Sequence, residues 1–139
     1  MASIHQEVRI AAAPDMVWDA MRDVGALHTR LAIGFVTDCR MERDEQADPP
    51  VLARVVTFAN GMVARELIVD VDDAKRRVAW SVVGGRLTHH NASLQVFAEG
   101  KGSHVVWIAD LLPNALAPAI AGMIEQGLSA MKKTLESSP

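Results

Sequence analysis

The chain has 139 residues and a mass of 15.0 kDa, which suits one folded domain spanning residues 1–139. Half of the residues are hydrophobic and 22% are charged, so the composition excludes an intrinsically disordered chain. The net charge of -3 and the pI near 5.9 argue against a nucleic-acid-binding protein, because such proteins usually carry a basic face.

The cysteine count and the hydropathy pattern give no sign of export or of a membrane segment. Cys39 is the single cysteine, so no intramolecular disulfide can form and nothing indicates an oxidising compartment. Residues 1–13 lack the basic and apolar regions of a signal peptide, and the longest apolar patch, 115–124, is too short to span a bilayer. We therefore expect a cytoplasmic protein with no integral membrane association.

The first third of the sequence predicts a strand, a pair of short helices and a second strand. Hydrophobic and polar residues alternate over Ser3–Ala11, which is the period of a half-buried strand. Pro14 stands at a typical first helical position, ahead of apolar residues at helical spacing. Gly25 ends that helix, Ala26–Ala32 favours another turn or two of helix, and Phe35–Met41 favours a strand.

The middle of the chain predicts a series of short strands joined by polar turns. The polar, proline-containing run Glu42–Pro50 is expected to be a solvated loop. The later strand segments are bounded by Gly, Asn or Asp, and they are Val51–Phe58, Val63–Val71, Arg77–Val83, Ala92–Phe97 and His104–Leu111. Together with the two earlier segments they predict a sheet of about seven strands.

The last part of the sequence predicts one long amphipathic helix. Apolar residues recur at steps of three and four from Leu116 to Leu135, and Asn114 is a candidate N-cap. About 20 residues at about 1.5 Å each give a length of roughly 30 Å, enough to cross a sheet. The predicted fold class is α+β, a curved antiparallel sheet wrapped around this helix. Because one helix cannot fill the whole concave face, we expect a hollow between the two layers.

Several segments resemble one protein family in their order and spacing. The segments are Ala12–Trp18 at the first helix, Glu66–Asp73, Trp80–Gly85 and Gly102–Trp107, with Asp110 and Pro113 before the last helix. Over nearly its whole length the chain is similar to the START-like, or polyketide cyclase/dehydrase-like (SRPBCC), superfamily. The resemblance implies a helix-grip fold and a cavity for a small, mainly hydrophobic molecule such as a lipid.

The segment Arg65–Leu94 is also similar to part of the plant abscisic-acid receptors, which belong to the same superfamily. That resemblance implies that Glu66 faces the pocket, that Trp80 forms an aromatic wall, and that Gly84-Gly85 helps to form the entrance. The gate loop of the receptors is longer than the corresponding turn here, and the position of their basic ligand anchor falls at Thr37. Hormone-type capture of a carboxylate is therefore not expected.

The turn at Asn60-Gly61 allows two hairpin registers. With a two-residue loop Arg54 lies opposite Leu67, whereas with a three-residue loop and a left-handed glycine it lies opposite Glu66. We favour the second register, because it pairs opposite charges on the face that the resemblance turns inward. An exposed pair of little energetic value is the alternative. The apolar odd-numbered residues within 67–71 leave a bulge or the opposite facing of this strand open.

We interpret the inward-facing residues as candidate ligand contacts. On the strands these candidates are Arg54, Val56, Phe58, Glu66, Trp80, Val82, Ala92 and Leu94. On the last helix the residues that match pocket positions of the family are Ala119, Met123 and Gly127. By the same comparison the core positions are Ile120, Ile124 and Leu128. Ordinary core packing is the alternative for the aromatic and small residues in these sets.

No motif identifies a reaction or a cofactor. His89 and His90 are adjacent, so on a strand they would point to opposite faces and could not share a metal; we assign them to a surface loop. Asp110 is expected to bond backbone groups at a strand end, with a general base as the alternative. Zinc, phosphate-loop and dinucleotide motifs are missing from the sequence, so we predict no metal and no cofactor.

The sequence is compatible with three functions. The leading hypothesis is a carrier or sensor that binds a small hydrophobic molecule between the sheet and the last helix. The first alternative is an enzyme resembling polyketide cyclases or aromatases, in which Arg54, Glu66 or a histidine assists proton transfer. The second alternative is a protein-interaction module, since strand edges can pair two copies into a homodimer. The sequence leaves open whether the protein is an enzyme.

Overall fold

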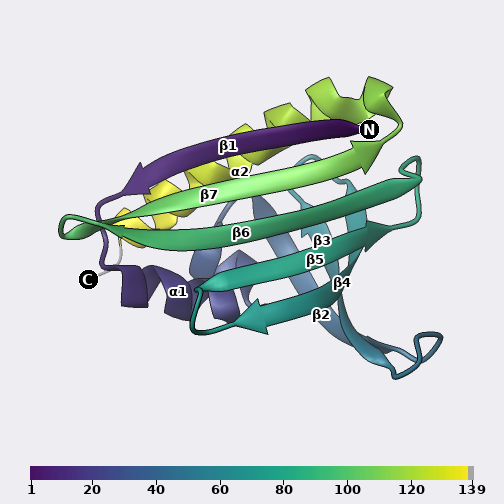
Figure 1. The fold of residues 1–139 in the computed structure, drawn as a ribbon, viewed down its shortest axis with the longest axis horizontal. Helices are drawn as coiled ribbons and strands as arrows, with labels where there is room; N and C mark the ends of the chain where they lie inside the picture. The colour runs from purple at the N-terminus through teal and green to yellow at the C-terminus, as the bar shows by residue number, and fades with distance from the viewer. Residues whose placement is uncertain (138–139) are drawn as a thin grey trace.

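The computed structural model describes residues 1–137. An open antiparallel sheet curves around a long C-terminal helix, and its strand order is β1-β7-β6-β5-β4-β3-β2 (Figure 1). The strands are β1 (Ala2–Ile10), β2 (Val36–Asp44), β3 (Val51–Phe58), β4 (Val63–Asp72), β5 (Arg77–Val83), β6 (His89–Glu99) and β7 (Gly102–Leu112). The helices are α1 (Pro14–Arg22), the π-helical turn η1 (Leu27–Leu31), the 3-10 turn η2 (Asn114–Leu116) and α2 (Ala117–Glu136). This is the predicted helix-grip fold, including the two short helices after β1.

The first and last strands of the chain, β1 and β7, are neighbours in the sheet. Strands β2 to β6 each pair with the next strand along the chain, whereas β1 pairs with β7. The long helix α2 lies against β1, where Gln6 Nε2 donates to the Ala121 carbonyl at 2.9 Å. Near the other end of α2, Lys132 Nζ donates to the Arg9 carbonyl at 3.0 Å. These two bonds fasten α2 along the concave side of the sheet.

The start of α2 differs from the sequence prediction. The prediction of Asn114 as its N-cap is wrong: Asn114 opens the turn η2, and Leu116 takes the cap position without a side-chain hydrogen bond. Pro118 fits the first turn of α2, where a backbone N–H has no intrahelical partner to lose. Pro14 begins α1 as predicted. Within residues 1–137 neither α2 nor any other helix is long and apolar enough to cross a membrane.

Strand β6 is longer than its sequence pattern predicts. It begins at His89 rather than at Ala92, because its pairing with β7 continues to the end of both strands. The assignment of His89 and His90 to a surface loop is therefore wrong, and both residues lie inside the sheet. In the same way β2 continues to Asp44, into the segment that was expected to be a loop.

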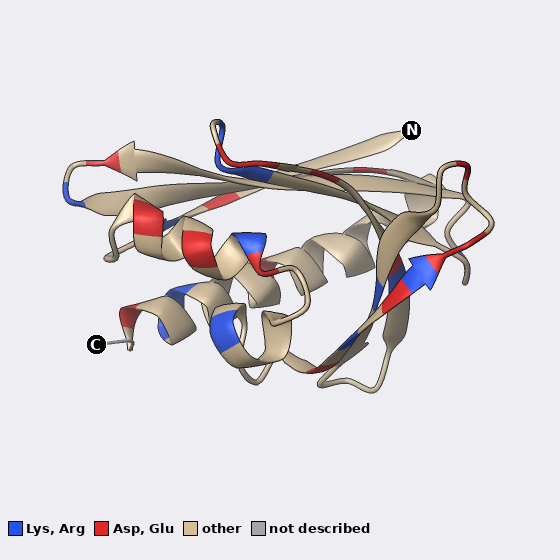
Figure 2. Cartoon of the chain, turned by 90° about the horizontal axis from the view of Figure 1, so that it is seen from below, with Lys and Arg blue, Asp and Glu red and all other residues tan. Residues whose placement is uncertain are grey.

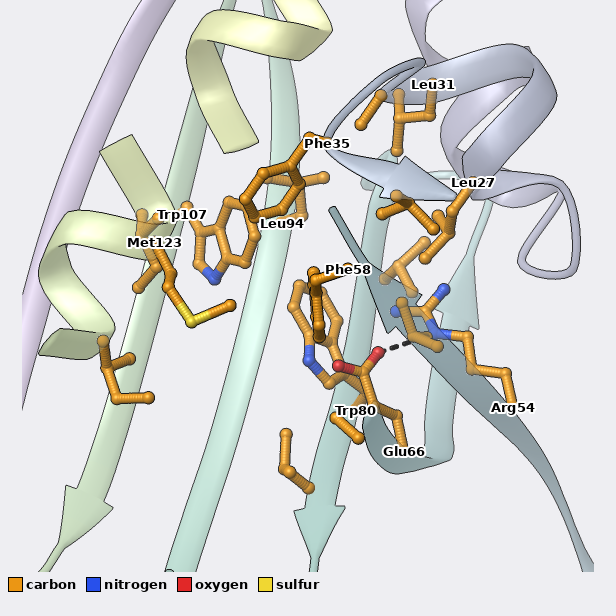
Figure 3. Close-up of a pocket in the computed structure, with 18 of the residues that line it drawn as sticks. Leu27, Leu31, Phe35, Arg54, Phe58, Glu66, Trp80, Leu94, Trp107 and Met123 are labelled. Atoms are coloured by element: carbon orange, nitrogen blue, oxygen red, sulfur yellow. Dashed lines mark hydrogen bonds and ion pairs between the residues drawn. The ribbon is translucent and has the colours of Figure 1, made fainter. Parts of the chain in front are cut away.

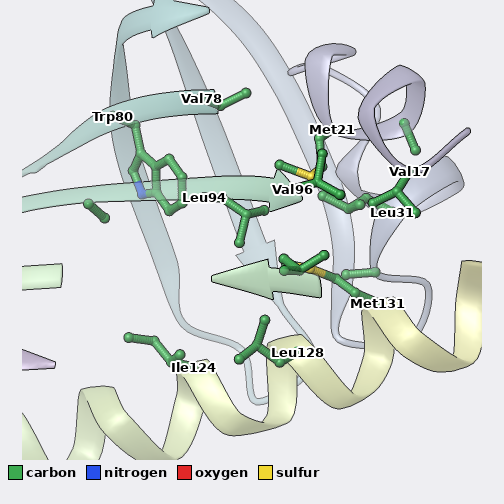
Figure 4. Close-up of a cluster of buried hydrophobic side chains, with 14 of the residues drawn as sticks. Val17, Met21, Leu31, Val78, Trp80, Leu94, Val96, Ile124, Leu128 and Met131 are labelled. Carbon is green, nitrogen blue, oxygen red and sulfur yellow. The ribbon is translucent and has the colours of Figure 1, made fainter. Parts of the chain in front are cut away.

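Apolar side chains fill the end of the interlayer space beneath α1 (Figure 4). Val17 and Met21 of α1 are 0% and 2% exposed. They belong to one buried cluster with Val96 of β6 and with Leu128 and Met131 of α2. Complete burial of such a side chain contributes roughly 1.5–3 kcal/mol to stability. The amphipathic helix α1 therefore closes this end of the fold.

Charged residues of both signs are interspersed along the outer loops and helices (Figure 2). Asp73, in the turn between β4 and β5, accepts hydrogen bonds at 2.9 Å from the Trp18 indole and from Arg22 Nε. These two donors, with Arg22 the larger cause, hold the pKa of the Asp73 carboxyl below its usual value. The contacts fasten α1 to the β4–β5 turn from the outside.

Candidate ligand-binding cavity

The β3–β4 hairpin brings together the most polar residues of the concave face. Gly61 adopts a left-handed φ of 86°, and the Phe58 N–H donates to the Met62 carbonyl at 2.8 Å. In the ladder that follows, Arg54 lies directly opposite Glu66. The favoured three-residue loop and its register are thus confirmed.

A β-bulge in β4 explains why the apolar pattern of this strand changes face. The register shifts by one residue between Ile68 and Asp70, and Val69 is 63% exposed. Glu66 and Ile68 face inward before the bulge, whereas Val71 faces inward after it. The strand therefore presents its even residues to the interior at one end and its odd residues at the other.

A cavity of about 130 Å³ lies between the concave face of the sheet and the helices (Figure 3). Its wall is mostly apolar and is built from β2 to β7, α1, η1 and α2. An engineered protein cavity of about 150 Å³ stays dry and binds benzene, so this volume admits a small apolar group. Towards solvent the wall ends at Met62, which is 52% exposed, and at the half-buried Leu87 of the β5–β6 loop.

The charged part of the wall is a buried ion pair between Arg54 and Glu66. Arg54 Nε donates to Glu66 Oε1 at 2.8 Å, and the two residues are 3% and 7% exposed. Arg54 Nη1 also donates to the Val24 carbonyl at 3.2 Å, and the guanidinium carbon lies 5.2 Å from the centre of the Trp80 ring. These contacts exclude an exposed pair, and they hold the α1–η1 connection against the sheet.

Aromatic side chains form the central part of the wall. Trp80 and Trp107 meet edge to face, with ring centres 5.6 Å apart and planes at 71°. The Trp107 ring packs so closely on α2 that a Cβ added to Gly127 would lie 2.9 Å from its Cζ3. Phe35 and Phe58 form a second edge-to-face pair at 5.3 Å. The sheet thus supplies two adjoining indole surfaces to the cavity.

Two buried nitrogen atoms in this wall, His90 Nδ1 and Trp107 Nε1, have no hydrogen-bond partner within residues 1–137. His90 is 9% exposed and shares the inward face of β6 with Leu94. Burial lowers the pKa of the His90 imidazole below its ordinary value, and the neighbouring His89 adds to the shift. His90 is therefore neutral at pH 7, with one ring nitrogen a donor and the other an acceptor.

The structure brings most of the predicted contact residues to the cavity. Those in its wall are Arg54, Val56, Phe58, Glu66, Trp80, Val82, Leu94 and Met123. Three others are not part of the wall: Ala119 is exposed, Gly127 lies behind Trp107, and Ala92 is buried beside Trp80 in the ladder. Ile120 and Ile124 line the cavity although they were expected in the core. The face of α2 that lines the cavity is therefore shifted by about one residue from the predicted face.

Sequence reasoning missed several wall residues. Met21 and Leu31 occupy helical positions whose spacing fits core and cavity equally well, so no sequence signal separates the two. For His90 a signal existed. The alternation of Ala92 and Leu94 on the inner face, extended upstream by one step, places His90 on the same face.

The remaining candidate groups lie away from the cavity. Asp110 is exposed on the outer face of β7, and it pairs across the ladder with Ser3 and Asn91. Cys39 is half-buried with its Sγ 3.8 Å from the Val24 carbonyl, and burial raises the pKa of its thiol. In the described part of the chain, no three or more His, Cys, Asp or Glu side chains are grouped so that they could hold a metal ion.

Comparisons with known proteins agree with this architecture. Residues 1–136 match the family model described as polyketide cyclase / dehydrase and lipid transport. A search of curated proteins gives no match. At identities below 25% a structural likeness shows the fold alone. XoxI from Bacillus cereus has a TM-score of 0.78 at 19% identity, over 99% of this chain and 97% of that chain.

Two further solved structures have the same fold. An uncharacterised protein from Bacillus thuringiensis has a TM-score of 0.79 at 17% identity, over 96% of this chain and 98% of that chain. Truncated norcoclaurine synthase from Thalictrum flavum has a TM-score of 0.70 at 21% identity, over 99% of this chain and 95% of that chain. Because the family model matches almost the whole sequence, the chain belongs to the polyketide cyclase / dehydrase and lipid transport family.

Proposed function

We propose that the protein binds a small, mainly hydrophobic molecule in the cavity between the sheet and α2, as a carrier or a sensor. The observation that carries this proposal is an apolar cavity whose wall residues include two with buried polar atoms that have no hydrogen-bond partner within residues 1–137. An unfilled cavity costs stability, because the side chains around it lose packing contacts. An occupant restores those contacts and gives His90 and Trp107 hydrogen-bond partners. The lipid transport named in the family description agrees with a hydrophobic occupant.

The proposed contacts combine a large apolar surface with one polar corner. The apolar contacts are Val56, Phe58, Trp80, Val82, Leu94 and Met123. Arg54 and Glu66 form the polar corner of the wall. A ligand seated there contacts both layers of the fold, so that its binding stabilises the packing of α2 on the sheet.

Methionine side chains allow this wall to adapt to ligands larger than the present cavity. Met21, Met62, Met123 and Met131 contribute to the wall from different elements. Methionine is unbranched and changes rotamer easily, so it repacks around different shapes at low cost. Met62 is already 52% exposed, and its movement would widen the mouth without opening the core.

The first test is a thermal-shift screen of the purified protein against aromatic polyketides, isoprenoids, fatty acids and sterols, with native mass spectrometry to detect a bound molecule. A true ligand at one hundred times its Kd stabilises the fold by about 2.7 kcal/mol. Met123→Trp fills the cavity and should abolish the shift. The control Ala119→Trp introduces the same indole side chain on the exposed face of α2 and should retain the shift. Equal shifts in both variants, or no shift with any compound in the wild type, would contradict the proposal.

A second candidate is an enzyme of the cyclase class, and a specific observation favours it. The neutral His90 imidazole lies in the same wall as the Glu66 carboxylate, so the cavity holds a group able to accept a proton. Incubating a bound ligand with the protein and analysing it by mass spectrometry separates the two candidates. A carrier returns the ligand unchanged, whereas an enzyme converts it at a rate that His90→Phe abolishes.

A further inference from the structure

The charges of the cavity wall are already matched to each other. Of the wall residues that the structure describes, Arg54 is the one cation and Glu66 the one anion, and they bond at 2.8 Å. Arg54 is further engaged by the Val24 carbonyl and by the face of Trp80. A carboxylate ligand would have to replace Glu66 or remain buried without a counter-ion, and both are costly. The wall therefore disfavours charged ligands.

The Trp107 indole provides a hydrogen-bond donor on the part of its ring that lies away from Gly127. Its Cζ3 and Cη2 atoms are those that contact the position of a Gly127 Cβ, and they lie on the benzo ring. The Nε1–H lies on the pyrrole part of the ring, away from Cζ3, and Figure 3 shows this nitrogen on the side that faces Met123. Nε1 is buried and has no hydrogen-bond partner in the described part of the chain. An indole N–H is a donor only, so its partner must be an acceptor.

The His90 imidazole provides a second polar atom at a distance from the first. In the β6–β7 ladder Leu94 pairs with Trp107, whereas His90 pairs with Leu111. The two side chains are thus four residues apart along the strand, roughly 13 Å at about 3.3 Å per residue. His90 Nδ1 is also buried and has no hydrogen-bond partner among the residues that the structure describes. The side chain of Trp80, which pairs with Ala92 midway between His90 and Leu94, lines the wall in this interval.

We infer that the cavity selects uncharged, elongated, mainly hydrophobic molecules that carry an oxygen acceptor for Trp107 Nε1–H and a second polar group, such as a hydroxyl, for His90 Nδ1. This inference rests on the proposed function and adds the chemical class of the ligand. Ketones and esters on a ring system or an isoprenoid-like chain fit this description. Fatty-acid anions and plain hydrocarbons do not fit it, because the anion lacks a counter-ion and the hydrocarbon leaves both nitrogens unpaired.

The test uses three probes of nearly equal shape: 2-ethylnaphthalene, 2-acetylnaphthalene and 2-naphthoate. Wild-type protein should bind the ketone and should bind the carboxylate at least about a hundredfold more weakly. In Trp107→Phe the preference for the ketone over the ethyl compound should fall by about five- to tenfold, the effect of one lost hydrogen bond. Taking the ratio of the two affinities cancels any gain from the extra space in this variant.

The indole N–H resonances of ¹⁵N-labelled protein report the bond directly. The ketone should shift the Trp107 signal, which Trp107→Phe identifies by its loss, and should leave that of Trp18 unchanged because Trp18 is bonded to Asp73. A second probe, 6-acetyl-2-naphthol, places a hydroxyl at the far end of the rings. It should bind about fivefold more tightly than the plain ketone in the wild type and equally in His90→Phe.

The outcomes separate this inference from the function on which it rests. If none of the probes binds, the proposed binding function itself fails. If the ethyl compound, the ketone and the carboxylate bind equally and the Trp107 resonance does not move, the cavity binds apolar molecules without polar selection, and the inference is overturned. If the hydroxyl brings no gain in affinity, His90 is not the second anchor.

Discussion

The two ends of the space between the sheet and α2 are built in different ways. Beneath α1 the space is filled, and Val17 and Leu128 are 0% and 4% exposed (Figure 4). Towards the β3–β4 hairpin the same sheet and the same helix enclose a cavity, and the wall ends at the exposed Met62 (Figure 3). The difference lies in α1, which packs its buried face onto the first end and reaches the cavity with Met21 near its C-terminal end. Packing at one end thus supports the fold while the other end keeps room for a ligand.

The largest expected effect comes from breaking the charge pair at the cavity end. Glu66→Leu leaves the buried Arg54 guanidinium without its carboxylate and should reduce the free energy of unfolding by about 3–5 kcal/mol in urea titrations. Replacing both partners, as Arg54→Met with Glu66→Leu, should recover most of this loss because no charge then remains buried.

The exposed pair of Arg65 with Glu42 is the control, since its Nε–Oε1 distance of 2.7 Å is as short as that of the buried pair. Glu42→Ala should cause a far smaller loss, because solvent screens that pair. A double variant as unstable as Glu66→Leu alone would mean that Arg54 and Glu66 act through shape rather than charge.

A smaller effect is expected from truncating side chains at the two ends. Leu128→Ala opens a void in the filled end and should cost about 3 kcal/mol of unfolding free energy. Met62→Ala, at the mouth of the cavity, should cost less than about 0.5 kcal/mol because its side chain is already half exposed. Chemical denaturation of both variants measures the difference. Equal losses would show that the cavity end is packed as tightly as the end beneath α1.

Most of the fold was predictable because its elements follow strong local patterns. The alternation in β1, the proline that begins α1 and the apolar steps of α2 each identify an element without knowledge of its neighbours. The ends of elements were less predictable. The extension of β6 to His89 depends on its pairing with β7, and the cap of α2 depends on the turn η2, so neither follows from local sequence.

Site residues on the strands were predictable, because alternation along a strand shows which residues share a face. Site residues on α2 were not, because the rotation of the helix about its axis depends on tertiary packing. Asn60-Gly61 allows two registers, and the one that pairs Arg54 with Glu66 is favoured because it joins opposite charges on the inward face. The orientation of α2 depends on how Trp107 packs against Gly127 in the folded protein. The family resemblance does not contain this contact, and it places Ala119 in the wall where the structure has Ile120.

The smallest expected effect is a loss of stability on acidification that comes from His90, at the cavity end. The folded protein holds the pKa of His90 below its ordinary value, whereas in the unfolded chain the pKa is about 6.5. Between those two values the unfolded chain binds more protons. The contribution of neutral His90 to the free energy of unfolding is therefore complete above about pH 6.5, and it is lost as the pH falls towards the pKa of the folded state. Urea titrations at about pH 7.5 and at about pH 5.5 measure this loss.

The loss belongs to His90 if His90→Phe reduces it while His5→Gln does not, since the His5 side chain is 58% exposed on the outer face. The charged residues of the cavity wall, Arg54 and Glu66, offset each other and do not favour protonation of the imidazole. A bound neutral ligand should steepen the pH dependence, because it removes solvent that could hydrate a protonated ring. An unchanged slope in His90→Phe would mean that water reaches this end of the cavity as freely as it reaches the outer surface, and the contrast between the two ends would then lie in packing alone.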